Sequence, residues 1–260
     1  MDVFMKGITT FAYLFLTGSL IGWVIELFYR RFVPNRKTKI WVNPGFLTGP
    51  YLPIYGFGLS GLYYIKLGFS SFLPEGVWGV VLTLVFMVLA MTLIEYVGGI
   101  IFIKGMGIKL WDYSNQWGNI QGIICPLYSF FWGVIAVAYY FLLDPYVGIA
   151  IDWLSLHMEI LFFVGLFGGV FLVDLWRTLD LTVRIRKFAK ENKLVVKYEE
   201  LKESFIVWRE ENQQKRHFLR FFSKEEWKEG FSHYVREQKD KMEQLKKKGS
   251  VKFSSRKNKK

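Results

Sequence analysis

Residues 77–103 read VWGVVLTLVFMVLAMTLIEYVGGIIFI. The run contains one charged residue, Glu95, and meets no lysine before Lys104. A helix needs about 20 apolar residues to cross about 30 Å of hydrocarbon, so this run is long enough to span a membrane. A charged side chain in the middle of such a helix costs on the order of 3 kcal/mol on insertion scales. The run therefore predicts the fold class, and Glu95 raises the question of function.

Four other stretches of comparable length are apolar, at about 8–29, 48–68, 121–143 and 154–176. We therefore predict an all-α membrane protein with about five transmembrane helices. The first stretch is interpreted as a span, because only Lys6 precedes it and it is too long for the core of a cleaved signal peptide. The composition agrees, since 52% of the residues are hydrophobic.

The charges divide the chain into two predicted domains. Nine basic and nine acidic residues precede Arg177, whereas 25 basic and 13 acidic residues follow from there to Lys260. We predict a polytopic transmembrane domain at 1–176 and a basic tail at 177–260, helical to about 244 and disordered beyond. Connections rich in lysine and arginine alternate with connections that lack them. This alternation predicts a multi-pass cell-membrane protein with its N-terminus outside and its tail in the cytoplasm.

Two parts of the membrane domain have similar sequences. GWVIELFY (22–29) precedes NPGFLTGPYLPIYG (43–56), and LIEYVGG (93–99) precedes NIQGIICPLYS (119–129). Each part has a glutamate, a loop and then a Gly-x-x-x-Pro-x-Tyr stretch. Two hairpins related as parallel repeats, plus one further helix, would produce this pattern; a chance likeness is the alternative. The glycines and prolines of 45–61 favour either a re-entrant start to the second span or an interfacial loop.

The two glutamates lie on faces that carry small residues. Gly18, Gly22 and Glu26 recur every four residues, and Met91, Glu95 and Gly99 do the same. Such faces turn toward other helices and not toward lipid. Glu26 lies one turn before Arg30, so a helix-end ion pair is an alternative to a functional role. Glu95 has no basic residue one turn away, which favours a functional or inter-helix role.

Two further features admit more than one interpretation. The segment KLWDYSNQWGNIQG (109–122) borders the membrane, and its aromatic residues indicate either an interfacial belt or a polar pocket on the inner side. Asp174 is interpreted as a helix-end residue near Arg177. It points away from a packing face that we predict at Gly165, Gly168 and Gly169.

Four ordered segments, at 22–29, 43–56, 111–114 (WDYS) and 119–133 (NIQGIICPLYSFFWG), together resemble the permease-like membrane family described as putative ABC-transporter type IV. The resemblance covers about residues 8–140, and the basic segment FVPNRKTKIW (32–41) departs from the family pattern. It implies a set of signature positions, which are our candidate substrate-binding residues: Glu26, Asn43, Gly45, Pro53, Tyr55, Gly56, Glu95, Trp111, Asp112, Tyr113, Ser114, Asn119 and Gly122.

Several classes of site have no signature in the sequence. There is no Gly-x-x-x-x-Gly-Lys-Ser/Thr loop, so ATP-driven transport would need a separate ATPase subunit. There is also no Gly-x-Ser-x-Gly elbow, no CxxC pair and no histidine spacing suited to a metal. We therefore predict no catalytic residues, no metal and no cofactor, and we do not expect an enzyme. The single cysteine, Cys125, excludes an intrachain disulfide.

The function expected from these features is binding or transport of a small solute or lipid at an inner-facing polar site built around Glu26 and Glu95. A non-transporting scaffold or regulatory subunit is the alternative, and a membrane enzyme acting on lipid headgroups has only the paired carboxylates in its favour. For the basic tail we favour contact with anionic lipid headgroups. A solvated helix is the main alternative, and nucleic acid is the least favoured partner.

Overall fold

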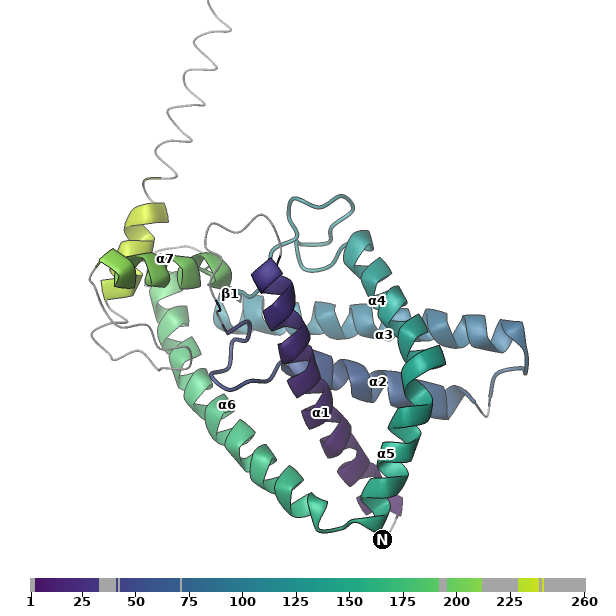
Figure 1. The fold of residues 1–260 in the computed structure, drawn as a ribbon. Coiled ribbons are helices and arrows are strands. Elements are labelled where there is room, and N and C mark those ends of the chain that lie inside the picture. Colours follow the sequence, from purple (N-terminus) through teal and green to yellow (C-terminus); the bar gives the residue numbers. More distant parts are fainter. Residues whose placement is uncertain are drawn as a thin grey trace, which may run out of the picture. The chain divides into compact units, whose positions relative to one another are not determined.

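The computed structural model describes residues 3–32, 41, 43–70, 72–191, 196–211, 229–238 and 240. It divides into two compact units, 1–195 and 196–260. The first unit is a set of helices with the strand β1 at Ile108–Lys109 (Figure 1). Its helices are α1 (Val3–Phe32), α2 (Pro53–Phe69), α3 (Val77–Ile100), α4 (Pro126–Ala138), α5 (Asp144–Leu156) and α6 (Ile160–Glu191), with π-helical turns η1 (Ile101–Met106) and η2 (Tyr139–Leu143).

Four helical stretches are long and apolar enough to cross a membrane: Phe4–Phe32, Val77–Met106, Pro126–Leu156 and Ile160–Lys187. They correspond to four of the five predicted spans and indicate a membrane protein. The remaining predicted span, 48–68, contains α2, which begins only at Pro53 and has 17 residues. At about 1.5 Å per residue α2 is about 26 Å long, slightly less than a hydrocarbon core. Its crossing of the membrane stays a prediction.

The loop expected around Asp144 and Asp152 is helical. Helix α4 continues through η2 into α5 and ends at Leu156, so the predicted end of this span near 143 was wrong. Pro145 lacks a backbone N–H, and the π-helical turn η2 ends two residues before it, at Leu143. The two acids were interpreted as loop residues, but a helix tolerates acidic side chains at the membrane surface. Helix α6 likewise continues beyond Trp176, where we placed the domain boundary.

Helices α1 and α2 approach each other through glycine. A Cβ atom at Gly56 would overlap the Phe15 carbonyl oxygen and the Ser19 hydroxyl, and one at Gly22 would overlap the ring of Tyr55. Such close contact is typical of membrane helices that pack through small residues. The predicted helix-facing stripe at Gly18 and Gly22 is therefore confirmed.

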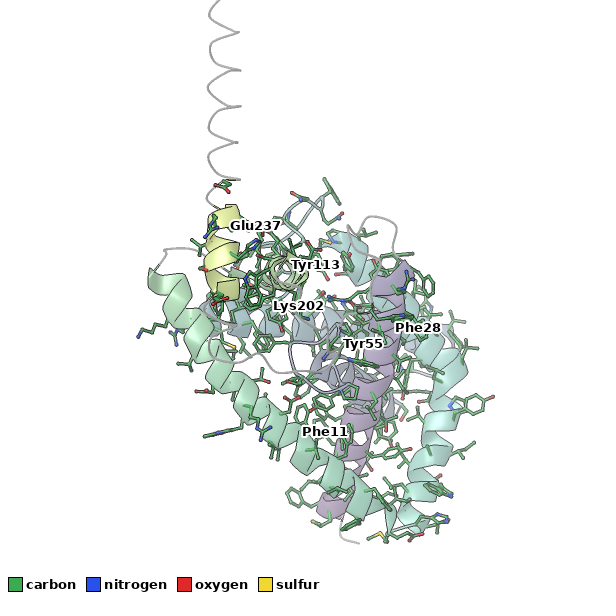
Figure 2. All side chains as sticks on the ribbon, turned by 60° about the vertical axis from the view of Figure 1, so that its left-hand side comes forward. Phe11, Phe28, Tyr55, Tyr113, Lys202 and Glu237 are labelled. Carbon is green, nitrogen blue, oxygen red and sulfur yellow. The ribbon has the colours of Figure 1, made fainter. Side chains whose placement is uncertain are left out.

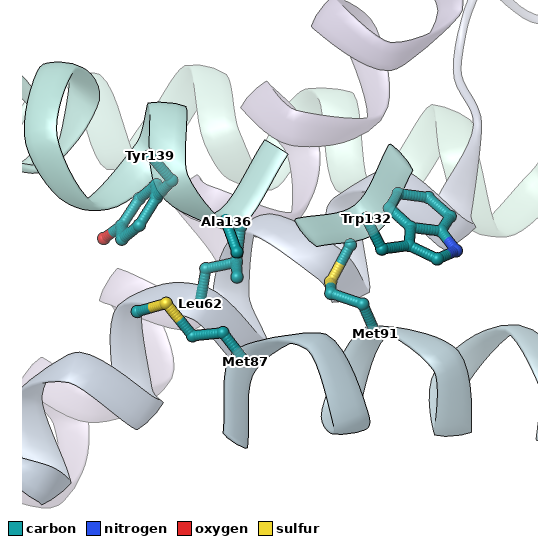
Figure 3. Close-up of a cluster of buried hydrophobic side chains, with 6 residues drawn as sticks. All are labelled: Leu62, Met87, Met91, Trp132, Ala136 and Tyr139. Atoms are coloured by element: carbon teal, nitrogen blue, oxygen red, sulfur yellow. The ribbon is translucent and has the colours of Figure 1, made fainter. Parts of the chain in front are cut away.

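The buried residues of α3 recur every four positions, at Gly79, Thr83, Met87, Met91, Glu95 and Gly99. This confirms that the face carrying Glu95 turns toward other helices. A core cluster forms where the stripe meets α2 and the α4–η2 helix (Figure 3). The cluster consists of Leu62, Met87, Met91, Trp132, Ala136 and Tyr139.

The second unit contains β2 (Val196–Lys197), α7 (Tyr198–Glu211) and a helical segment at 229–238. Leu201, Phe205 and Trp208 on α7 are buried. The Phe205 ring packs edge-on against Phe231, with ring centroids 5.7 Å apart. The end of the tail, where we predicted disorder, lies outside the described residues.

Candidate functional site

Glu95 is a buried carboxylate held by neutral donors. Its residue is only 3% exposed. The Trp132 indole donates its Nε1–H to Oε2 over 2.9 Å, and the Tyr113 hydroxyl donates to Oε1 over 3.0 Å. Among the described residues, no lysine or arginine forms an ion pair with Glu95. The Glu95 carboxylate therefore accepts two hydrogen bonds, but no basic side chain in the described part of the chain pairs with it.

Tyr113 reaches Glu95 from the segment between η1 and α4. Its backbone N–H donates to the Gly122 carbonyl over 2.8 Å, and its ring stacks on Tyr128 with centroids 4.1 Å apart. Gly122 has a φ of 66°, in the left-handed region that favours glycine. Burial, and then the charge of Glu95, raise the pKa of Tyr113 well above its usual range. The phenol therefore remains a neutral donor at physiological pH.

Glu26 has a different environment near the C-terminal end of α1. Arg30 donates from Nε to Oε1 over 2.7 Å, as expected for an ion pair one helical turn apart. The Tyr55 hydroxyl also lies 3.3 Å from Oε2. Glu26 therefore makes both the ion pair within α1 and a contact with α2.

Aromatic rings connect the two glutamates. Tyr55, which donates to Glu26, packs edge-on against Trp132, which donates to Glu95; their ring centroids are 6.0 Å apart. Tyr55 and Tyr113 are both labelled in Figure 2. Of the predicted site residues, Glu26, Tyr55, Glu95 and Tyr113 thus come together in one cluster, with Arg30 and Trp132 as its other members. We call it the inner polar cluster, after the side of the membrane on which the sequence predicts it.

The other candidates from the first loop shape its backbone. The Asn43 carboxamide oxygen accepts from Gly45 N–H and from Trp23 Nε1, while its Nδ2 donates to the carbonyls of Leu47 and Thr48. Pro53 occupies the first turn of α2, where its missing N–H costs no helical bond. Gly56 is the close-packing position described above. These residues support the cluster without contacting Glu95.

The remaining candidates form the segment that carries Tyr113. Trp111 donates its indole N–H to the Ile123 carbonyl over 2.8 Å. The carboxylate of Asp112 pairs with Lys109 and also accepts from Ser114. Asn119 accepts from Gly122 N–H over 3.0 Å. Trp117, by contrast, is 86% exposed. It is the one aromatic residue of this segment with the exposure that an interfacial belt requires.

Asp174 is not a helix-end residue, and that interpretation was wrong. It lies within α6, is 7% exposed, and accepts from Gly49 N–H over 2.8 Å and from the Tyr51 hydroxyl over 2.6 Å. The packing face predicted at Gly165, Gly168 and Gly169 meets no other helix: a Cβ atom at any of these glycines would have no neighbour within 4 Å in the described part of the chain.

Trp132 and Asp174 are the residues that sequence reasoning missed. Trp132 lies in one of the quoted segments, and an indole N–H inside an apolar span needs an acceptor, which is the signal that was available. For Asp174, the nearby Arg177 suggested a surface pair and obscured a contact with residues 125 positions away. No group of three or more metal-binding side chains occurs among the residues that the structure describes.

A family model described as "Putative ABC-transporter type IV" matches residues 13–179. The match covers more than half of the chain and includes most of α1 through the first part of α6, so it extends beyond the 8–140 expected from the motifs. No curated protein and no solved structure gives a significant match to the chain.

Proposed function

The chain belongs to the family described as putative ABC-transporter type IV, and we propose that it binds a small solute or lipid at the inner polar cluster and moves it across the membrane. One observation carries the proposal: Glu95 is buried in a membrane helix, and its hydrogen-bond partners in the part of the chain that the structure describes are neutral donors. Keeping a carboxylate there is costly, and such residues usually belong to ion or substrate pathways.

The cluster has a net negative charge when both acids are ionised. Glu26 is paired with Arg30, but the charge of Glu95 has no such partner in the described residues. A ligand that brings a hydrogen-bond donor or a positive charge would therefore be stabilised there. Energy from ATP would have to come from a separate ATPase subunit, which the family name loosely allows.

The experiment is to purify the protein in mild detergent and identify co-purified lipids and solutes by mass spectrometry. Glu95→Gln and Glu26→Gln should each reduce the amount of the retained molecule at least several-fold. Glu75→Gln is the matched control, because Glu75 is exposed in the connection before α3. If both cluster variants fold and retain the same molecules as the control, the proposed site is wrong.

A non-transporting scaffold or regulatory subunit is the second candidate, and α6 supports it. Only 6% of the apolar stretch of this helix is buried against the rest of the chain, the lowest share of the four long helices. Gly165 and Gly169 lie on this helix at the spacing of small-x-x-x-small packing motifs. A stoichiometric protein that co-purifies through α6, without any bound small molecule, would favour this candidate over transport.

The basic second unit is compatible with both proposed functions. We propose that it lies against anionic headgroups of the cytoplasmic leaflet, because each nearby basic residue contributes about 1 kcal/mol of attraction. Flotation of the protein's isolated tail with vesicles containing phosphatidylserine, compared with neutral vesicles, tests this partner separately from the membrane site.

A further inference from the structure

A second polar cluster lies at the other end of the core from Glu95. Lys66 of α2 forms an ion pair with Asp144 of α5, and the Tyr139 hydroxyl donates to Asp144 over 3.1 Å. The Lys66 ammonium also lies 4.6 Å from the centre of the Tyr140 ring. Both members of the ion pair are largely shielded, with side chains 27% and 22% exposed. We call these four residues the outer polar cluster.

The two polar clusters share one hydrophobic barrier. Trp132 belongs to the core cluster and donates to Glu95, while Tyr139 belongs to the same core cluster and donates to Asp144. In Figure 3 the indole nitrogen of Trp132 and the hydroxyl of Tyr139 lie at opposite ends of the cluster. Met87, Met91, Leu62 and Ala136 fill the space between them, and Ala136 is fully buried.

The two polar clusters are close enough together for the core cluster alone to block a path between them. Tyr55 and Lys66 are about 16 Å apart along α2, and Trp132 and Tyr139 are about 10 Å apart along their helix, at about 1.5 Å per residue. The barrier is thus a few side chains thick. Methionine is unbranched and adapts its shape readily, so a Met-rich barrier can repack at low cost.

The helix that joins the clusters contains a place where it can bend. Residues 139–143 form the π-helical turn η2, and Pro145 follows after one residue, Asp144. π-helical turns are frequent at functional sites, and proline removes a helical hydrogen bond. Because Tyr139 and Asp144 lie within or beside this turn, a change in it would move both relative to Lys66 on α2.

From this arrangement we propose that the Lys66–Asp144 pair is the outer gate of the path that starts at the inner polar cluster, and that the pair keeps the core barrier closed in this conformation. The inference rests on the proposed transport function. A shielded ion pair between two helices stabilises one of two arrangements, and its separation would expose Tyr139 and then the barrier.

The test measures access to the barrier and needs no ligand. Cys125 is the only cysteine, so Cys125→Ser gives a background into which Ala136→Cys places one thiol in the barrier. The protein is reconstituted in vesicles and exposed to a membrane-impermeant methanethiosulfonate on either side. With the pair intact, the thiol should be unreactive from both sides. Asp144→Asn should raise its reaction rate from the Lys66 side about tenfold or more. The reason is that the closed conformation loses the ion pair that favours it over the open one.

Two variants make the result decisive. The charge exchange Lys66→Asp with Asp144→Lys should return the reaction rate to the closed value, and it also serves if Asp144→Asn fails to fold. Glu159→Gln, which removes an exposed acid between α5 and α6, should leave the rate unchanged. An unchanged rate in a folded Asp144→Asn protein, or a high rate in the charge exchange, would overturn the gate.

This outcome is separable from that of the inner polar cluster. If Glu95→Gln loses the co-purified molecule but Asp144→Asn does not open the barrier, the binding site stands and the gate is wrong. If the barrier opens but the glutamate variants retain all molecules, the gate stands and the proposed site is wrong.

Discussion

Trp132 and Tyr113 supply the hydrogen-bond donors that satisfy the buried carboxylate of Glu95 inside the helical bundle. A buried carboxylate that loses a donor is left with an unsatisfied lone pair, which costs about 1–3 kcal/mol. Both donors come from segments that follow α3 in the chain, one from a helix and one from a loop. The acid thus ties the return helix and the preceding loop to α3.

Trp132→Phe should lower the free energy of unfolding by about 1–3 kcal/mol, because the ring is retained but the N–H to Glu95 is lost. The loss should shrink in a Glu95→Gln background, since the neutral amide is easier to leave unpaired. Thermal unfolding in detergent measures both. Trp117→Phe is the control, because Trp117 is 86% exposed; equal losses at the two tryptophans would contradict the role given to the indole.

Asp174→Ala should release the loop before α2, because the acid holds both Gly49 N–H and the Tyr51 hydroxyl. We expect hydrogen exchange in a peptide covering 43–52 to become about tenfold faster, as for the loss of about 1.4 kcal/mol of local stability. Tyr51→Phe should give a smaller change, and Glu159→Ala none. Unchanged exchange in Asp174→Ala would mean that Asn43 and the packing hold this loop without α6.

At the scale of the helices, glycine sets the spacing between α1 and α2. The contact leaves no room for a methyl group at Gly22, whereas a Cβ atom at Gly7 on the same helix meets nothing within 4 Å. The two positions differ in environment but share a helix, so they form a matched pair.

Gly22→Ala should therefore destabilise the protein by about 1–3 kcal/mol through overpacking against Tyr55. Gly7→Ala should be neutral or stabilising by up to about 1 kcal/mol, because alanine favours the helix more than glycine does. Thermal unfolding of the two variants in the same detergent measures the difference. A Gly22→Ala protein as stable as Gly7→Ala would show that α1 and α2 separate without cost.

Since Tyr55 also contacts Glu26, weaker retention of a bound molecule should accompany the loss of stability in Gly22→Ala.

For the whole molecule, the number of crossings decides on which side each end lies. If α2 crosses, the chain has five spans and its two ends lie on opposite sides; if it does not, they lie on the same side. We expect five crossings, because residues 43–52 pack against α1 and α6 and extend the short α2 at its inner end.

Cysteines introduced at exposed positions of the two connections test this topology in a Cys125→Ser background. Phe72 is 85% exposed and Trp117 is 86% exposed. In intact cells, an impermeant maleimide should label a cysteine at 72 but not one at 117. A cysteine placed before α1 should behave like the one at 72. Opposite labelling of 72 and the N-terminus would contradict five crossings, whereas labelling of 117 with neither 72 nor the N-terminus labelled would contradict the predicted orientation.

Hydrophobic runs and glycine spacing were sufficient to predict the helical membrane class, four of the long helices and the buried faces of α1 and α3. These features depend on short-range patterns, since length and a four-residue period are properties of one segment. The end of the fourth span was wrong because acidic residues at 144 and 152 are compatible with either a loop or a helix end at a membrane surface. Four of the thirteen candidate site residues lie in the inner polar cluster. Pro53 and Gly56 lie in α2, and the other seven lie in the two loops beside the cluster.

The helical membrane class, the helix-facing position of Glu95 and the Arg30 pair of Glu26 all follow from spacing along the chain. The partners from distant segments required the folded structure: an indole and a phenol for Glu95, a phenol for Glu26, and a loop amide and a phenol for Asp174. The physical reason is that helix periodicity depends on neighbours along the chain, whereas a hydrogen-bond partner depends on how distant segments pack, and each of these acids accepts from residues on another element.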